Sequence, residues 1–522
     1  MMKTTQKSRL LLFVATMLSS SLAFAQTKEA FVSSVTKEAT ENSQLEKLAH
    51  ELFDVVGPRL VGTPQMKQAG DWAVKKYGDW GISAKMEKWG EWRGWERGIT
   101  HIDLVSPRLR TLEGTQLAWS PSTVKGKPIN AEAIVLPLVA DSMAFAKWLP
   151  SVKGKLVLIS QAQISGRPDK NYEDFATKDG LAKFKKDKEE AAKAWRDRLA
   201  KTGMNAKNLA LAIEKAGAAG IIINNWSAGW GVDKVFGANT TKIPTVDLSV
   251  EDYGLVYRLA EYGNKPMLRI ESESKELGVV PTFNTLAEIK GNEKPNEYVM
   301  LSAHFDSWDA SSGATDNGTG TIMMMEAMRL LKKFYPNPKR TILVGHWASE
   351  EQGLNGSRAF TEDHPEIINN LQALFNQDNG TGRVVNIGGA GFAKAKDFLP
   401  RWLAAVPDTI KNQIKTNFPG TPSGGGSDNA SFVAAGALGF SLGALPWDYF
   451  SYTWHTNRDT YDKVVFDEVR SNAILAAILV YMACEDPERT SNEKAPMSVN
   501  PRTNQPGVWP APVKANRKGG LN

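Results

Sequence analysis

The chain has 522 residues and a formal net charge of +6, and 42% of its residues are hydrophobic. A chain of this length is too long to fold around one small hydrophobic core, so we predict two or three domains. The positive charge is concentrated in an N-terminal leader with three basic residues and in the tail 491–522, whose net charge is +4. The body between them is close to neutral, so the composition gives no indication of a nucleic-acid partner.

The first 25 residues have the pattern of a secretory signal peptide. Basic residues precede an apolar run at 10–17, and small residues then lead to an A-x-A site that ends at Ala25. Because the run is too short to span a membrane, we expect cleavage near Ala25 and a secreted or periplasmic protein without a membrane span. The single cysteine, Cys484, excludes an intrachain disulfide and is expected to be a buried structural thiol.

Three regions follow the leader. Residues 43–85 carry apolar positions three and four apart, which is typical of amphipathic helices, and a turn-rich break follows at 118–128. Beyond it, short β-rich runs separated by helical stretches predict an inserted α/β unit, in which the highly charged stretch 177–201 predicts a solvated helix; a lid or a dimer contact is the alternative. The expected organisation is a signal peptide (1–25), the N-terminal part of a catalytic domain (26–128), an inserted domain (129–275), the C-terminal part of the catalytic domain with the metal site (276–490) and a Pro-rich basic tail (491–522).

From about residue 285 the pattern alternates between strand and helix. Apolar runs at 298–306, 341–349 and 437–444 read as strands, and 319–334 and 466–483 read as helices. Alternating strands and helices predict an α/β fold, with a mostly parallel mixed sheet covered by helices on both faces.

Five residues of this region have the types and order of a two-metal hydrolase site. Two imidazoles and three carboxylates follow apolar strands or lie in Gly-rich and turn-rich loops, and the carboxyl ends of parallel strands meet at one edge of a sheet. Two zinc ions bring four positive charges; three carboxylates and one bridging hydroxide would neutralise them. The candidate ligands are His304, Asp316, Glu351, Asp378 and His455.

Two further carboxylates are candidate catalytic residues. Glu350 stands directly before a candidate ligand, where a general base could face the nucleophilic water. Asp306 lies two residues beyond His304, on the same face of an extended segment, so we expect its carboxylate to hold the imidazole. His346 lies inside a predicted strand and is not expected to bind metal.

The motifs HFDSWD, GATDNGTG, ASEEQGLNGS, FNQDNG and HTNRDTYD together resemble those of the co-catalytic zinc exopeptidases, a family that includes bacterial aminopeptidases and glutamate carboxypeptidases. The resemblance implies a zinc exopeptidase fold with a protease-associated insert and two zinc ions bridged by Asp316. By the same resemblance, His304 and Asp378 complete one site, Glu351 and His455 complete the other, and the Asp316–Asn317 peptide bond is cis. Asn317, Asn429 and Trp454 depart from residues that many members carry at these positions.

The expected activity is hydrolysis of peptide bonds in short peptides by metal-bound hydroxide, with Glu350 as general base. An aminopeptidase or dipeptidase is favoured over a carboxypeptidase. Two alternatives on the same fold are a glutaminyl-cyclase-like enzyme with one zinc and a non-catalytic, receptor-like binding protein. Tyr452 is a weak candidate for an oxyanion donor, and a homodimer is left open.

Overall fold

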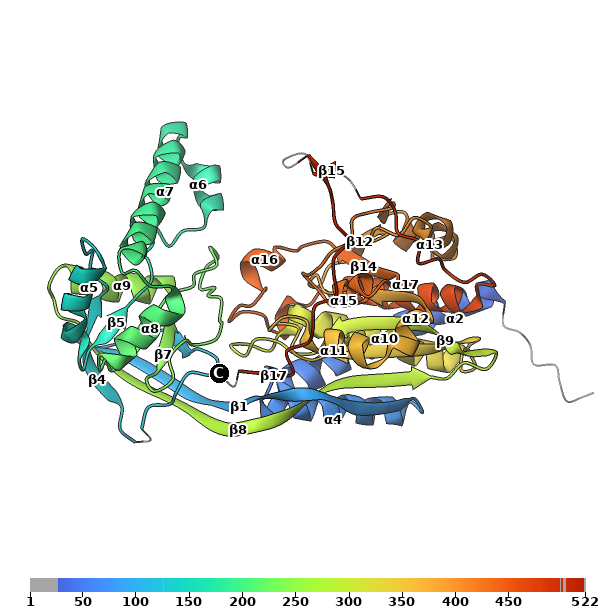
Figure 1. Cartoon of the computed structure of the whole chain (residues 1–522), viewed down its shortest axis with the longest axis horizontal. Helices are drawn as coiled ribbons and strands as arrows, with labels where there is room; N and C mark the ends of the chain where they lie inside the picture. The colour runs from blue at the N-terminus through green and yellow to red at the C-terminus, as the bar shows by residue number, and fades with distance from the viewer. Residues whose placement is uncertain (1–26, 125, 498, 501–503, 521–522) are drawn as a thin grey trace, which may run out of the picture.

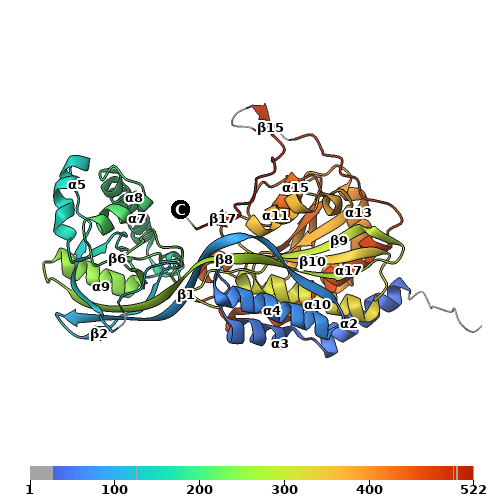
Figure 2. The ribbon, with the colours of Figure 1, turned by 60° about the horizontal axis from the view of Figure 1, so that its bottom comes forward.

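The computed structural model describes residues 27–124, 126–497, 499–500 and 504–520; the predicted signal peptide lies outside them. Figures 1 and 2 show two lobes side by side, joined by the long strands β1 (Ser83–Ser106) and β8 (Met267–Ile289). No helix in the described part of the chain is long and apolar enough to cross a membrane.

The larger lobe is built on the strands that follow β8. β9 lies between β10 and β11 and is parallel to both, and β11 is parallel to β14, whereas β8 and β12 join the sheet antiparallel to β10 and β14. This mixed sheet confirms the predicted α/β class. Its strands are β9 (Lys294–His304), β10 (Arg340–Trp347), β11 (Leu371–Asn376), β12 (Val384–Gly388), β13 (Lys415–Asn417) and β14 (Gly439–Ala444).

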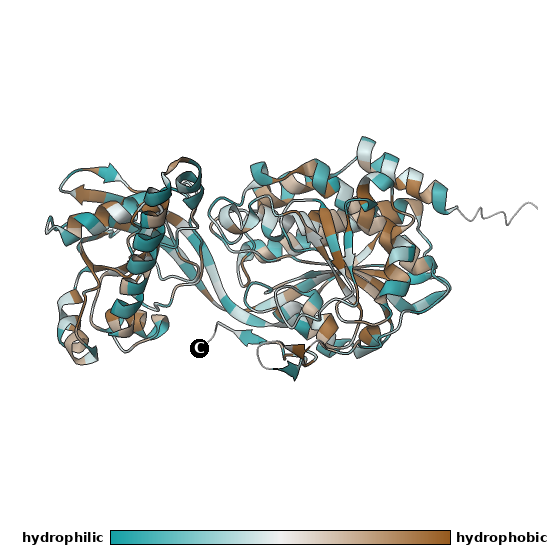
Figure 3. Ribbon diagram, turned by 90° about the horizontal axis from the view of Figure 1, so that it is seen from above, coloured by the Kyte–Doolittle hydropathy of each residue, from teal (hydrophilic) through white to brown (hydrophobic). Residues whose placement is uncertain are grey.

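Helices cover both faces of this sheet. On one face α10 (Thr319–Phe334) and α17 (Phe466–Glu485) form the largest apolar core of the described residues with the N-terminal helices, and the three methionines of α10 are buried in it. Cys484 is buried at the end of α17, as expected. Figure 3 shows the strands between these layers to be strongly hydrophobic. The remaining helical elements are α2 (Lys28–Glu41), α3 (Leu45–Ala49), the π-helix η1 (His50–Val56), α4 (Pro64–Asp79), the π-helix η3 (Ala314–Gly318), α11 (Asn355–Asp363), α12 (Pro365–Asn369), α13 (Ala395–Leu403), α14 (Asp408–Lys411), α15 (Asn429–Ala434), α16 (Tyr449–Tyr452) and the 3-10 turn η4 (Tyr461–Lys463).

The smaller lobe contains a parallel four-stranded arrangement, β4–β5–β6–β7, with helices around it. The four β-rich runs recognised in the sequence correspond to these strands, and the charged stretch forms the exposed helix α7, which projects from the lobe in Figure 1. Its elements are β2 (Arg110–Thr111), β3 (Gly114–Gln116), β4 (Ile129–Val135), α5 (Ser142–Trp148), η2 (Leu149–Val152), β5 (Leu156–Leu158), α6 (Asp169–Phe175), α7 (Lys178–Ala200), α8 (Ala206–Lys215), β6 (Gly220–Ile223), β7 (Thr245–Leu248) and α9 (Val250–Glu261).

The packing of the smaller lobe differs from the expected boundaries at 129 and 275. Ile102 and Leu104 of β1, and Leu112, pack in the same core as residues of β4 to β7. At the other end, β8 contributes Leu268 and Ile270 to that core and Ala287 and Ile289 to the core of the larger lobe. The correction has a physical reason: β1 and β8 pair with each other from Ser83↔Glu288 to Ser106↔Met267, so the chain passes between the lobes within a continuous two-stranded ladder.

The described part of the tail runs along the larger lobe. Trp509 packs edge-on against Phe392, and Arg517 pairs with Glu362 and Asp363. The basic residue Arg517 is therefore engaged with the protein itself. The short strands here are β15 (Val499–Asn500), β16 (Gln505–Pro506) and β17 (Lys518–Gly519), of which β17 pairs with β1.

Candidate active site

The structure brings the five candidate ligands together at the carboxyl edge of the larger sheet. His304 is the last residue of β9, Glu351 follows β10 and Asp378 follows β11. Asp316 lies in η3, and His455 lies in the loop after α16 with a left-handed φ of 60°. The ends of three adjacent strands thus supply three of the five side chains, as the strand pattern predicted.

The ligand atoms form two groups that share Asp316. Atoms of His304, Asp316 and Asp378 lie within 4.8 Å of one another, and so do atoms of Asp316, Glu351 and His455. In the first group the His304 Nε2 is 3.1 Å from Asp378 Oδ1 and 3.4 Å from Asp316 Oδ1. In the second the His455 Nε2 is 2.8 Å from Glu351 Oε2 and 3.4 Å from Asp316 Oδ2. The Asp316–Asn317 peptide bond is cis, in agreement with the resemblance.

These groups fit zinc. Two ligand atoms that bind a tetrahedral zinc at about 2.0 Å lie roughly 3.3 Å apart, close to the separations seen here. Asp316 Oδ2 and Glu351 Oε1 are buried, and neither has a hydrogen-bond partner in the described protein. Buried carboxylate oxygens without partners are costly unless a cation binds them. The donor set, imidazole and carboxylate, is one that zinc prefers.

Glu350 lines the same cavity as the five ligand residues. Burial raises the pKa of its carboxyl well above the usual range, and the negative charges of Asp378, Asp428 and Glu351 add to this effect. Cations held by the neighbouring groups would oppose that repulsion. Glu350 is therefore placed to exchange a proton with a water molecule in the cavity.

Asp306 does not hold His304 in the way expected. The His304 Nδ1 lies 3.0 Å from the backbone oxygen of Asp306 but 3.8 Å from its nearer carboxylate oxygen. The carboxylate instead accepts the backbone N–H groups of Glu350 and Glu351, at 3.0 and 3.3 Å. Asp306 thus fixes His304 through its main chain and the Glu350–Glu351 turn through its side chain.

The sequence reasoning missed two buried residues near the ligands, Asp459 and Arg59. Asp459 accepts the backbone N–H groups of Thr315 and Asp316, at 2.8 and 2.9 Å, and burial raises its pKa to about 7. Asp459 lies in the motif HTNRDTYD, close to the candidate ligand His455, and this position is the sequence signal that could have identified it. Arg59 is fully buried and donates to the carbonyl oxygens of Phe305, Ser312 and Gly313, on either side of the loop that leads to Asp316. Its local sequence, GPRLVG at 57–62, contains no signal for this role.

Tyr449, rather than Tyr452, lies beside Asp316. Its side chain is buried, and the negative charge of Asp316 adds to burial in raising the pKa of the phenol well above the usual range. Tyr452 instead lies against Gly229 of the smaller lobe. The two tyrosines lie at opposite ends of the short helix α16.

The smaller lobe closes one side of the site. Phe236 packs edge-on against the His455 ring at 5.4 Å, and Lys234 Nζ lies 4.0 Å from the centre of the Trp454 ring. Trp454 itself stacks on His455 and lines the cavity. Residues of the smaller lobe therefore pack against His455 and its neighbour Trp454.

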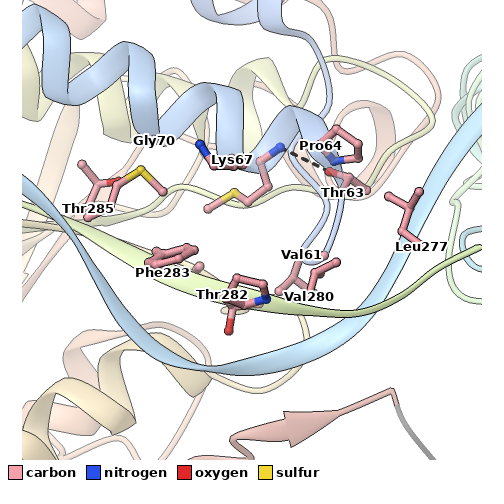
Figure 4. Close-up of a pocket in the computed structure, with 15 residues that line it drawn as sticks. Val61, Thr63, Pro64, Lys67, Gly70, Leu277, Val280, Thr282, Phe283 and Thr285 are labelled. Carbon is pink, nitrogen blue, oxygen red and sulfur yellow. Dashed lines mark hydrogen bonds between the residues drawn. The ribbon is translucent and has the colours of Figure 1, made fainter.

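The cavity over the ligands has a volume of about 310 Å³, enough for a small peptide. A second cavity, of about 210 Å³, lies between the start of α4 and β8 and is lined mainly by apolar side chains, among them Val61, Leu277 and Phe283 (Figure 4). None of the candidate ligands lines it. The chemistry of the molecule is therefore assigned to the first cavity, whose walls are His304, Asp316, Glu350, Glu351, Gly353, Leu354, Arg358, Asp378, Gly425, Gly426, Trp454 and His455.

Residues 284–480 match the model of Peptidase family M28. Among curated proteins the chain is similar to Carboxypeptidase Q of Mus musculus, with 27% identity over 85% of this chain and 86% of the relative. It is 28% identical to Carboxypeptidase Q of Bos taurus over the same shares.

Solved structures agree with this similarity. The Peptidase M28 precursor from Shewanella amazonensis SB2B has 25% identity and a TM-score of 0.63, and the match covers 89% of this chain and 98% of that one. BSAP, a zinc aminopeptidase from Bacillus subtilis, shares the fold, with 18% identity, a TM-score of 0.55 and coverage of 88% and 98%. The chain is thus similar to the zinc exopeptidases of peptidase family M28, whose model matches residues 284–480, and these similarities support a zinc-dependent metallopeptidase.

Proposed function

We propose that the chain is a secreted di-zinc exopeptidase that removes residues from short peptides, as an aminopeptidase or dipeptidase rather than a carboxypeptidase. The observation that carries the proposal is the pair of ligand groups that share Asp316 and face the cavity lined by Glu350. Secretion rests on the leader sequence ending at Ala25.

In this proposal His304 and Asp378 would hold one zinc, Glu351 and His455 would hold the other, and Asp316, which belongs to both groups, would serve both. Zinc in such a site lowers the pKa of water and polarises a carbonyl group. Glu350 takes a proton from the attacking water and returns it to the leaving amine. Asp306 holds the backbone of Glu350 and Glu351, so the base and the adjacent ligand keep fixed positions during the proton transfer.

The test uses the mature chain after removal of the leader. Metal content is measured, and hydrolysis of a free dipeptide, an N-acetylated dipeptide and a dipeptide amide is followed in metal-depleted and zinc-restored enzyme. We expect two zinc ions per chain, no turnover after depletion, restoration by zinc and rejection of the N-acetylated substrate. One zinc per chain with cyclisation of N-terminal glutamine would favour the cyclase alternative, and full hydrolysis by the metal-free protein would refute the proposal.

A further inference from the structure

Two buried aspartates of the smaller lobe flank one short segment, residues 223–226. Ile223 pairs with Asp247 of β7, and Trp226 forms a β-bridge with Asp233. Asp233 and Asp247 are only 4% and 1% exposed. The backbone pairing therefore places two carboxyl groups beside the same few residues, and none of these residues is a candidate zinc ligand.

Oxygen atoms of this cluster lack partners in the described part of the chain. Neither carboxylate oxygen of Asp247 makes a hydrogen bond. The Asn224 side chain donates through its Nδ2 to Asp233 Oδ1 at 2.9 Å and to the carbonyl of Leu248 at 2.8 Å. Both of these partners are acceptors, so the orientation of the amide is fixed, and its Oδ1 is left buried and without a partner. The backbone and side chain of Asn225 lie near the Asp247 carboxyl and act to lower its pKa, but three buried oxygens of the cluster make no hydrogen bond of normal geometry. Leaving such atoms unpaired is costly.

Within the described ranges, no lysine or arginine forms an ion pair with either carboxylate. Burial raises the pKa of Asp233 to about 7, and Glu251 and Glu113 add to the effect; burial and the charge of Asp233 raise the pKa of Asp247. Arg458, whose charge opposes the shift at Asp233, is bound instead to Glu113 and to the carbonyl of Gly231. The cluster therefore combines negative charge with unpaired hard oxygen atoms.

We propose that Asp233, Asp247 and Asn224 bind a divalent cation of the calcium class, at a site separate from the zinc ligands. All three offer oxygen, the donor that calcium prefers, and two carboxylates balance the charge of one such ion. Zinc is disfavoured because no imidazole or thiol takes part.

The site is coupled to the candidate active site through the backbone. The Asp233 N–H donates to Asn457 Oδ1, and the Asn457 N–H donates to the carbonyl oxygen of Asp233, both at 3.0 Å. His455 lies two residues before Asn457. A cation on Asp233 therefore fixes the segment that contacts the loop of the second zinc group.

The experiment uses the zinc-saturated mature enzyme, so that the catalytic ligands are already occupied. Calcium chloride is titrated while the thermal midpoint is followed, and equilibrium dialysis counts bound calcium. Terbium luminescence excited through tryptophan gives a separate reading, because Trp226 adjoins the cluster. We expect one calcium per chain and a rise in the midpoint of at least ~2 °C at saturating calcium.

Asp247→Asn and Asp233→Asn should each lose calcium binding and the thermal shift while zinc content is kept. Glu189→Gln, an exposed acidic residue of α7 in the same lobe, is the matched control and should behave like the unaltered protein. If Asp247 is only a protonated structural acid, calcium will leave the midpoint of the unaltered protein unchanged and dialysis will show none bound; either result overturns the proposal. Calcium binding that survives both substitutions also overturns it.

Discussion

Val235 of the smaller lobe donates its backbone N–H to the carbonyl oxygen of His455, at 2.8 Å. The adjacent residue Lys234 forms a β-bridge with Thr456. His455 adopts a left-handed backbone conformation, which non-glycine residues rarely take without support. A ligand of the second metal group is therefore held in position by a segment that folds with the other lobe.

Removing this contact is expected to affect one metal. Val235→Pro deletes the N–H, whereas Val235→Ala keeps it and serves as the control. Contacts that orient a metal ligand are commonly worth 10–100-fold in affinity, so we expect the proline variant to hold the zinc on Glu351 and His455 about 10–100-fold more weakly. Zinc titration with a chelator measures this. Equal affinities in the two variants would show that the contact does not orient His455.

The adjacent glutamates are expected to separate catalysis from metal binding. Glu350→Gln should lower kcat by about 10²–10⁴-fold with unchanged zinc content, because it removes only the proton acceptor. Glu351→Gln should lose about one zinc per chain. Steady-state kinetics and metal analysis on both variants provide the check, and a similar loss of zinc from both would reverse the assignment.

Arg59 is expected to stabilise the loop that carries the metal ligands. Its guanidinium is fully buried and donates to four carbonyl oxygens, and burial lowers its pKa to about 10. Arg59→Met leaves those acceptors without a donor, so we expect a loss of roughly 3 kcal/mol or more in the free energy of unfolding. Urea denaturation measures the loss, and Arg108→Met, at an exposed position, should change it by less than about 0.5 kcal/mol.

His346 is expected to make the protein acid-sensitive. It is fully buried on β10, its Nε2 lies 2.7 Å from the Tyr77 hydroxyl, and burial lowers its pKa to about 3. The unfolded chain takes up the proton near pH 6.5 and the folded chain does not, so stability falls as the pH decreases from 6.5 towards 3. The loss from this residue alone reaches about 2 kcal/mol at pH 5.

His346→Gln removes the titrating group and should flatten this part of the pH profile. Denaturation midpoints between pH 7 and 5 compare the two proteins. An unchanged slope in the variant would mean that other groups cause the acid sensitivity.

The sequence predicted those parts of the fold that depend on local pattern. Apolar runs that end in polar residues identified β9, β10 and β11 together with the ligands at their ends, because parallel strands present these ends at one edge. The expected contact of the Asp306 carboxylate with His304 differs from the structure, in which that carboxylate accepts backbone N–H groups of Glu350 and Glu351. A spacing of two residues does not reveal such contacts with a distant loop. The sequence did not distinguish Tyr449 from Tyr452, because their neighbours, Asp316 for the first and Gly229 for the second, come from distant parts of the chain.

The long strand β1 was not predicted. Its 24 residues contain many charged side chains and three glycines, and register shifts against β8 interrupt the alternation of buried and exposed positions. The simple period of two on which a strand prediction relies is therefore lost. Because residues of this strand pack in the core of the smaller lobe, that core begins earlier in the chain than the expected boundary at residue 129.

The ladder of β1 and β8 makes the two lobes inseparable by simple genetic excision. Deleting 129–275 would remove the first nine residues of β8 and leave the apolar side chains of Ile102 and Leu104 exposed to water. A viable deletion would instead have to shorten both strands at paired positions, such as Trp95 and Glu276, and rejoin them as a hairpin. The smaller lobe thus lies at the far end of the β1–β8 ladder, which begins in the core of the larger lobe. A chimaeric protein that carries the smaller lobe must therefore include both strands.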